Sequence, residues 1–278
     1  MFDAWLLEGF PWLTALFATT TGILVYREYR RHRRRHPQFP IAAVKLPEFD
    51  SRFRCDSVER ARQGAVYFLG NPNNQLPATT SDEEAYVLAC LSKDVRRIFE
   101  FGTCSGRTTY LMALNACSDA QITTLTLPPD DPSMQLHSEM NAHDVSHAVS
   151  ESHFDQFVYS ETEVAHKVEQ LFQDSAALDV EPYRGKMDLI FIDGGHSYAY
   201  IKSDTEKALQ MIAPGGCIVW HDYRGLRCRE TRGVFRYLNE LHRDLPLQRL
   251  GGTSLIAYRV PEDAAPKQAP LHGSQQAA

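Results

Sequence analysis

The feature that most constrains the fold of this 278-residue chain is a series of short apolar runs separated by stretches of helical character. Nearly continuous apolar strands with helices between them are typical of a parallel sheet covered on both faces. The runs span residues 97–101, 122–127, 168–172, 189–192 and 217–220. Two further strands, 247–250 and 254–260, lie on either side of Gly251-Gly252 and predict a closing antiparallel hairpin. The sequence therefore predicts an α/β fold with a doubly wound sheet of seven mostly parallel strands.

The N-terminal segment predicts a membrane helix. Residues 9–26 are 18 residues without an ionisable charge, and residues 27–36 carry six arginines. Eighteen helical residues rise about 27 Å, close to the roughly 30 Å hydrocarbon core of a bilayer. Positive charges that follow the apolar run disfavour a cleaved signal peptide and place the rest of the chain in the cytoplasm. We expect a single-pass protein of the inner membrane whose main domain faces the cytoplasm.

Two alternatives to a membrane span stay open at this point. Four threonines, Pro11 and Glu8 dilute the hydrophobicity of the segment. A helix lying on the membrane surface, or one in a soluble protein that packs on the main domain, would also accommodate this composition.

The composition divides the whole chain into four segments. We expect a transmembrane anchor with its basic flank over residues 1–36, a proline-rich linker and helical lead-in over 37–80, the main domain over 81–260, and a disordered tail over 261–278. Ser81 and Glu84 form the pattern of a capping box, which predicts a helix from there to about Ser92. The net charge is −6 in spite of the basic flank, so the main domain is acidic. An acidic domain argues against a nucleic-acid partner.

A glycine-rich turn follows the first strand of the predicted sheet. Residues 99–109 read FEFGTCSGRTT, so that Gly102 and Gly106 lie where the strand ends and a helix begins. Glycines there let the backbone approach a ligand, and the amides at a helix start favour a carboxylate or phosphate. The spacing differs from the G-x-G-x-x-G of dinucleotide folds and from the P-loop, which disfavours a nicotinamide-dependent oxidoreductase.

Polar side chains follow two later strands. Asp193 and His196 come after residues 189–192, and His221 and Asp222 come after residues 217–220. If these strands are neighbours, all four side chains converge at the carboxyl edge of the sheet, where open α/β folds bind their ligands. Two carboxylates and two imidazoles in one place suit a divalent metal or a general base.

Taken together, residues from about 81 to 260 resemble the class I S-adenosylmethionine-dependent methyltransferases. They look closest to the branch of the macrocin-type sugar O-methyltransferases and cephalosporin-hydroxylase-like proteins. The resemblance implies a Rossmann-like sheet, S-adenosylmethionine as cofactor, and a divalent metal such as Mg²⁺. It implies these cofactor-binding residues: Glu100, Gly102, Thr103, Gly106, Thr126, Asp174, Ser175 and Asp193. Asp193 and Asp222 match positions that bind metal or acceptor, and we expect His196 or His221 to act as catalytic base.

The second strand departs from this family pattern. The family usually places an acidic residue there to bind the ribose hydroxyls, and this chain has Thr126. A threonine makes one hydrogen bond where a carboxylate makes two charge-assisted ones, a difference of roughly 1–3 kcal/mol. Asp130 or Asp131 would have to reach back past two prolines to compensate.

The function we expect is transfer of a methyl group to a hydroxyl oxygen of a sugar, a lipid-linked molecule or another small acceptor. The alternative is a catalytically inactive protein of the same fold that serves as a binding or scaffold subunit at the membrane. Thr126 is the feature that favours this alternative.

Overall fold

The computed structural model describes residues 3–35, 39–54, 80–128, 154 and 156–264, with side chains omitted near both ends of the first helix. The chain separates into two compact units, residues 1–40 and 41–278. Asp130 and Asp131 lie outside the described residues, as does most of the predicted linker and tail.

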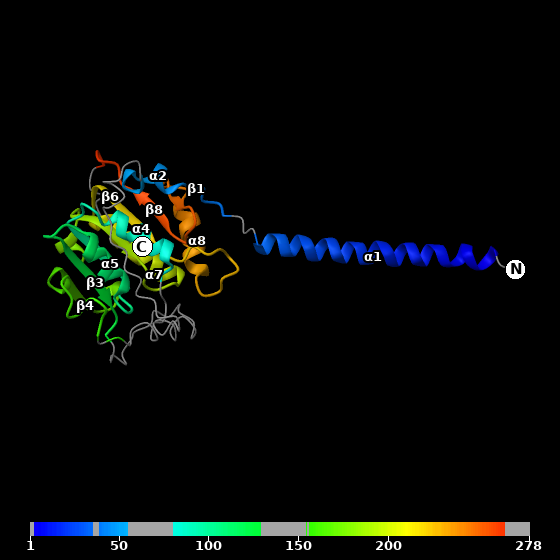
Figure 1. Ribbon diagram of the computed structural model, residues 1–278, viewed down its shortest axis with the longest axis horizontal. Helices are drawn as coiled ribbons and strands as arrows, with labels where there is room; N and C mark the ends of the chain where they lie inside the picture. The colour runs from blue at the N-terminus through cyan, green and yellow to red at the C-terminus, as the bar shows by residue number, and fades with distance from the viewer. Residues whose placement is uncertain (1–2, 36–38, 55–79, 129–153, 155, 265–278) are drawn as a thin grey trace, which may run out of the picture. The chain divides into compact units, whose positions relative to one another are not determined.

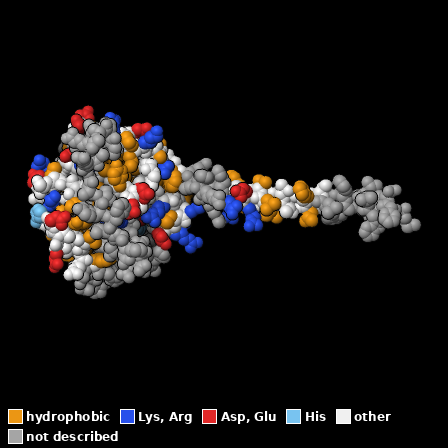
Figure 2. Space-filling view, viewed as in Figure 1, with side chains coloured by type: hydrophobic (Ala, Val, Ile, Leu, Met, Phe, Trp, Pro, Cys, Tyr) orange, Lys and Arg blue, Asp and Glu red, His pale blue; other side chains and the backbone are white. Residues whose placement is uncertain are grey.

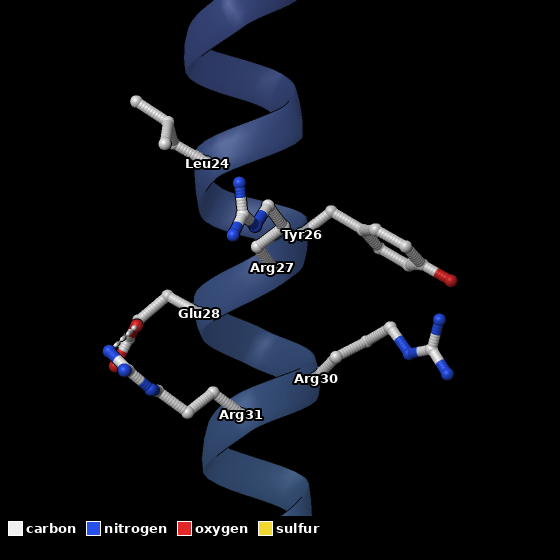
Figure 3. A pocket seen from close by; sticks show the side chains of 6 residues that line it. All are labelled: Leu24, Tyr26, Arg27, Glu28, Arg30 and Arg31. Atoms are coloured by element: carbon white, nitrogen blue, oxygen red, sulfur yellow. Dashed lines mark ion pairs between the residues drawn. The ribbon is translucent and has the colours of Figure 1, made fainter.

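The first unit is dominated by α1 (Asp3–Arg35). Its described apolar side chains are exposed, including Leu16, Phe17 and Leu24. The hollow drawn in Figure 3 lies between side chains of this one helix, where the Arg30 guanidinium is 5.8 Å from the centre of the Tyr26 ring. Figure 2 shows basic and apolar side chains together on the helix. Among the described residues, no helix combines the length and the apolarity that crossing a bilayer requires. The predicted membrane-spanning helix is therefore not supported.

The second unit is built on an eight-stranded sheet in the order β1-β7-β8-β6-β5-β2-β3-β4 (Figure 1). The strands are β1 (Ala43–Val44), β2 (Arg97–Phe101), β3 (Gln121–Thr126), β4 (Val168–Phe172), β5 (Met187–Ile192), β6 (Ile212–Trp220), β7 (Gln248–Leu250) and β8 (Ile256–Arg259). All neighbours are parallel except that β8 is antiparallel to both β6 and β7. The predicted mostly parallel sheet with a closing hairpin is thus confirmed.

One strand of the sheet was not predicted. The two-residue β1 comes from the segment expected to be a linker, and it pairs in parallel with β7, Ala43 opposite Arg249. The amides of Arg249 and Gly251 donate to the carbonyls of Ala42 and Val44. Since Ile41 is fully buried beside it, this part of the predicted linker belongs to the folded domain.

The helices pack in pairs. The longer ones are α4 (Asp82–Leu91), α5 (Arg107–Asn115), α7 (Tyr198–Met211) and α8 (Arg232–Leu241), with one-turn α2 (Leu46–Phe49) and the 3₁₀ turns η1 (Ser51–Phe53), η2 (Ala165–Lys167), η3 (Ser175–Ala177) and η4 (Glu181–Tyr183). Helix α4 packs on α5, and α7 packs on α8. The capping box predicted at the start of α4 is present, with Ser81 Oγ accepting from the Glu84 amide and Glu84 accepting from the Ser81 amide.

The strand order reverses direction beside β2. The chain passes from β2 outward to β3 and β4, and then returns to place β5 on the other side of β2. The crevice between the carboxyl ends of β2 and β5 is therefore the switch point, where doubly wound sheets bind ligands. Gly102 and Asp193 lie at this point, because they directly follow β2 and β5.

The backbones of these two residues are in very close contact. The amide of Asp193 donates to the Phe101 carbonyl over 2.8 Å, and Gly102 has a φ of +97°. A Cβ added at Gly102 would lie 2.2 Å from the Asp193 carbonyl oxygen. The sequence suggested that this glycine leaves room for a ligand. The structure shows that it leaves room for the neighbouring strand end.

We predict that Gly102→Ala lowers the free energy of unfolding by about 1–3 kcal/mol more than Gly185→Ala does. Both glycines have a positive φ, so both variants incur left-handed strain, but a Cβ at Gly185 meets nothing within 4 Å. Chemical denaturation of the two variants measures the difference. Equal destabilisation would show that the strand ends do not need this close approach.

Candidate active site

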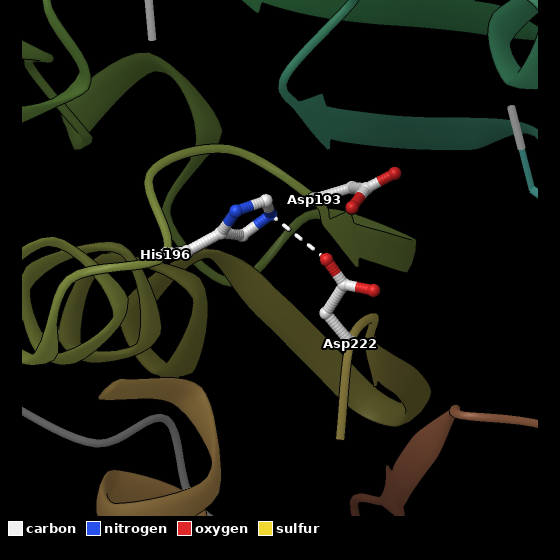
Figure 4. A group of neighbouring side chains, drawn as sticks. All are labelled: Asp193, His196 and Asp222. Atoms are coloured by element: carbon white, nitrogen blue, oxygen red, sulfur yellow. Dashed lines mark ion pairs between the residues drawn. The ribbon is translucent and has the colours of Figure 1, made fainter. Parts of the chain in front are cut away.

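Four of the predicted site residues meet at the carboxyl ends of β5 and β6. Ile192 and Trp220 are paired across these strands, so Asp193, His221 and Asp222 follow side by side. His196 comes from the loop that leads into α7. Ligand atoms of Asp193, His196 and Asp222 all lie within 4.8 Å of one another (Figure 4). The expected convergence of the two segments is therefore found.

The first pair in this cluster is His196 and Asp222. His196 Nε2 lies 3.1 Å from Asp222 Oδ2, and both side chains are largely buried. Asp222 has a φ of +64°, a conformation that costs a non-glycine residue energy and that is common at functional sites. Arg224 Nε lies 2.7 Å from the other carboxylate oxygen of Asp222. Burial alone would raise the pKa of Asp222, but the hydrogen bond from His196 and the nearby positive charges outweigh it and lower the pKa.

His221 is buried between two carboxylates. Its Nδ1 lies 2.7 Å from Asp193 Oδ1, and its Nε2 lies 3.2 Å from Glu84 Oε2. Burial would lower the pKa of His221, but the charge of Asp193 and the hydrogen bonds to Asp193 and Glu84 raise it well above the usual value. The raised pKa favours the protonated ring, which donates from both nitrogens to the carboxylates and has no lone pair with which to accept a further proton. Of the two predicted bases, the geometry therefore favours His196.

Sequence reasoning missed Glu84 as a member of this cluster. Its carboxylate is buried, and it accepts from Ser254 N and Oγ as well as from the Ser81 amide. These contacts and the contact with His221 hold the pKa of Glu84 well below its usual range, against the opposing effect of burial. The capping-box pattern located the residue, but no local pattern connects position 84 with position 221.

Glu100 occupies a different environment from the one expected. Its carboxylate is fully buried and accepts hydrogen bonds from Thr108 Oγ1 at 2.5 Å, Thr124 Oγ1 at 2.7 Å, and Thr109 Oγ1. Burial raises the pKa of Glu100 to about 7, although the three hydroxyls oppose the shift. Both oxygens are occupied by protein hydroxyls, so this side chain joins β2 to α5 and β3.

The comparison with protein families decides what kind of domain holds this site. Residues 99–223 match the model of a family described as a methyltransferase domain. The chain contains a methyltransferase domain. With the sheet described above, this match confirms the predicted enzyme class, a class I S-adenosylmethionine-dependent methyltransferase. The match does not separate the macrocin-type branch from others.

Solved structures that match this chain at low identity include O- and N-methyltransferases. The O-methyltransferase TomG from Streptomyces achromogenes, solved with S-adenosylmethionine, is 18% identical over 66% of this chain and 82% of its own, with a TM-score of 0.45. A putative O-methyltransferase from Klebsiella pneumoniae is 20% identical over 69% and 91%, also at 0.45. The N-methyltransferase NodS from Bradyrhizobium japonicum is 17% identical over 65% and 96%, at 0.43. No curated protein sequence matches. At these values the assignment rests on the family model.

The glycine-rich turn of the methyltransferase domain leads into α5 as predicted. Gly106 is the N-cap of α5, in a left-handed conformation and with no side chain capping the helix. The positive end of the helix dipole therefore lies at the switch point, which suits the carboxylate of the cofactor's methionine part. A Cβ at Gly106 would approach Phe157 and Tyr159 within 2.9 Å. Thr103 is buried, its hydroxyl 2.8 Å from that of Thr124.

The residues expected around the ribose and adenine lie at the ends of β3 and β4. Thr126 is the last residue of β3 and is buried. Asp174 and the buried Ser175 open the turn η3, where Asp174 Oδ1 accepts from the Ala176 amide and Oδ2 from the Tyr200 hydroxyl. These residues share the carboxyl edge with Asp193. Their roles toward the cofactor stay predictions.

Proposed function

We propose that the protein transfers the methyl group of S-adenosylmethionine to a hydroxyl oxygen of a small acceptor. The observation that carries this proposal is the His196–Asp222 pair beside Asp193 at the switch point of a methyltransferase domain. An imidazole oriented by a carboxylate is the usual device for removing a proton from a hydroxyl.

When bound, S-adenosylmethionine supplies a methyl group that moves by in-line displacement, with the carbon–sulfur electron pair leaving on sulfur. The chain's own residues then have two tasks. The turn from Gly102 to Gly106 and the start of α5 hold the donor, so that the acceptor oxygen is aligned at near-attack distance. His196 takes the proton of the acceptor hydroxyl on a ring nitrogen while Asp222 stabilises the resulting imidazolium.

The cluster also fits a divalent metal. Asp222 Oδ1 is buried and makes no hydrogen bond, although Arg224 Nε lies 2.7 Å away. Two carboxylates and an imidazole are ligands that Mg²⁺, Mn²⁺ and similar ions accept. Asp193, His196 and Asp222 would hold such an ion, and it would ease deprotonation of a hydroxyl.

Among hydroxyl acceptors, we favour a sugar or a lipid-linked molecule, because the sequence resembles the macrocin-type branch. The competing proposal is an inactive domain that binds a partner, which the replacement at Thr126 favours. The two proposals predict different results: an active enzyme transfers labelled methyl groups to an acceptor, and an inactive domain does not.

We predict that the purified full-length protein transfers labelled methyl groups from S-adenosylmethionine to an acceptor in an extract of its cells. His196→Ala should lower the rate by 10²–10⁴-fold, because the general base is lost. His166→Ala is the matched control with no expected effect, since His166 lies in η2 beside a hollow at the amino ends of β2 to β5. Loss of activity in EDTA, restored by Mg²⁺, would assign His196 to a metal instead. No labelled product from the wild type, or an unchanged rate in His196→Ala, would contradict the proposal.

We further propose that α1 associates with the inner membrane, with the methyltransferase domain on the cytoplasmic side. The exposed apolar side chains of α1 and Arg27, Arg30 and Arg31 support this location. The full-length chain should sediment with membranes, and high salt should release it if it lies on the surface. Retention after an alkaline carbonate wash would indicate a spanning helix instead. Recovery of the full-length chain in the soluble fraction at low salt would contradict any membrane association.

A further inference from the structure

A line of three buried or largely buried side chains runs from α4 to the switch point. Glu84 Oε2 lies 3.2 Å from His221 Nε2, and His221 Nδ1 lies 2.7 Å from Asp193 Oδ1. Glu84 and His221 are 4% and 6% exposed. Glu84 stands 15 residues before the start of the segment that matches the methyltransferase model, residues 99–223.

Glu84 is held more firmly than a capping residue requires. A capping box needs only that its N3 side chain accept from the N-cap amide, and N3 side chains of this kind are normally at the surface. Here Oε1 also accepts from Ser254 N at 2.8 Å and Ser254 Oγ at 2.6 Å, while Oε2 accepts from Ser81 N at 3.0 Å. The carboxylate is therefore fixed from α4 and from the turn between β7 and β8.

This fixed carboxylate determines the orientation of the His221 ring. An imidazole with a carboxylate on each nitrogen cannot rotate or flip without losing a charge-assisted hydrogen bond in a buried site. The ring in turn donates to Asp193, whose backbone is already set by its contact with Gly102.

We propose that Glu84 is a positioning residue that acts through His221 to hold the Asp193 carboxylate in one orientation at the cofactor crevice. The inference rests on the function proposed above for this site. It assigns part of the site to α4, which precedes the segment that matches the methyltransferase model, residues 99–223. In this arrangement His221 connects the carboxylates of Glu84 and Asp193.

The test uses Glu84→Gln in the full-length protein. Glutamine still serves in a capping box, but its single oxygen cannot satisfy Ser254 on one side and both Ser81 and His221 on the other. The matched control is Ser254→Ala, which removes a donor from Oε1 and leaves Oε2 facing His221. Thermal unfolding of both variants reports any general loss of structure.

Two readouts separate positioning from a structural role. The first is the far-downfield proton NMR signal of His221 Nδ1–H, assigned by its loss in His221→Asn. It should disappear or move upfield in Glu84→Gln and stay in Ser254→Ala. The second is calorimetry with S-adenosylmethionine. Glu84→Gln should weaken binding roughly tenfold, which is about 1.4 kcal/mol, and should have no further effect in an Asp193→Asn background.

An unchanged His221 signal in Glu84→Gln would overturn the inference. So would weakening of equal size in the Asp193→Asn background, because Glu84 would then act by another route. If the wild type binds no S-adenosylmethionine, the proposed function fails, and the NMR comparison still decides whether Glu84 orients His221.

Discussion

The close approach of Gly102 to the Asp193 carbonyl is the contact on which the candidate site depends. A Cβ at position 102 would lie 2.2 Å from that oxygen, so the strand ends meet in this way only because residue 102 is glycine. The contact places the first residue after β5 directly beside the turn that opens α5. Every other feature of the site is arranged around this junction: the helix dipole of α5 on one side, and the histidine–aspartate cluster after β6 on the other.

Buried charge is the second constraint on the site. Glu84, Asp193, His221 and Asp222 bring three carboxylates and an imidazole together with little access to water. Such groups are tolerated only when they are paired and hydrogen-bonded, and each of them has at least one partner of opposite charge. Removing one member would leave the charge of another uncompensated. The residue from α4 and the residues that follow β5 and β6 therefore depend on one another. Charge and backbone packing thus hold Asp193 from two directions.

Much of this fold could be predicted from local patterns. Strands β2 to β6 contain apolar runs long enough to be recognised as strands in the sequence, and Gly251-Gly252 indicated the hairpin of β7 and β8. Strand β1 has two residues and no pattern of its own, so only its pairing with β7 defines it. The apolar run over residues 9–26 suggested a membrane span, but no helix in the described part of the chain is both long and apolar enough to be one.

The site was predictable where strand order alone brings residues together. Asp193, His196, His221 and Asp222 could be expected to meet because each follows a buried strand. Glu84 could not be expected there, since its contact with His221 joins positions 137 residues apart. Its place in a capping box already explained why a glutamate occurs at this position. Glu100 was expected at the cofactor. Its three hydroxyl partners come from α5 and β3, and no pattern in the sequence around Glu100 predicts these contacts.

The most direct test of the central claim is to locate S-adenosylmethionine on the protein. Ultraviolet irradiation of the complex with labelled cofactor, followed by peptide mapping, reports which segment lies beside it. If the switch point is the binding site, the label should fall within residues 99–109 and 193–198. Label confined to the opposite edge of the sheet, near residues 166–169, or no label that unlabelled cofactor competes away, would contradict it.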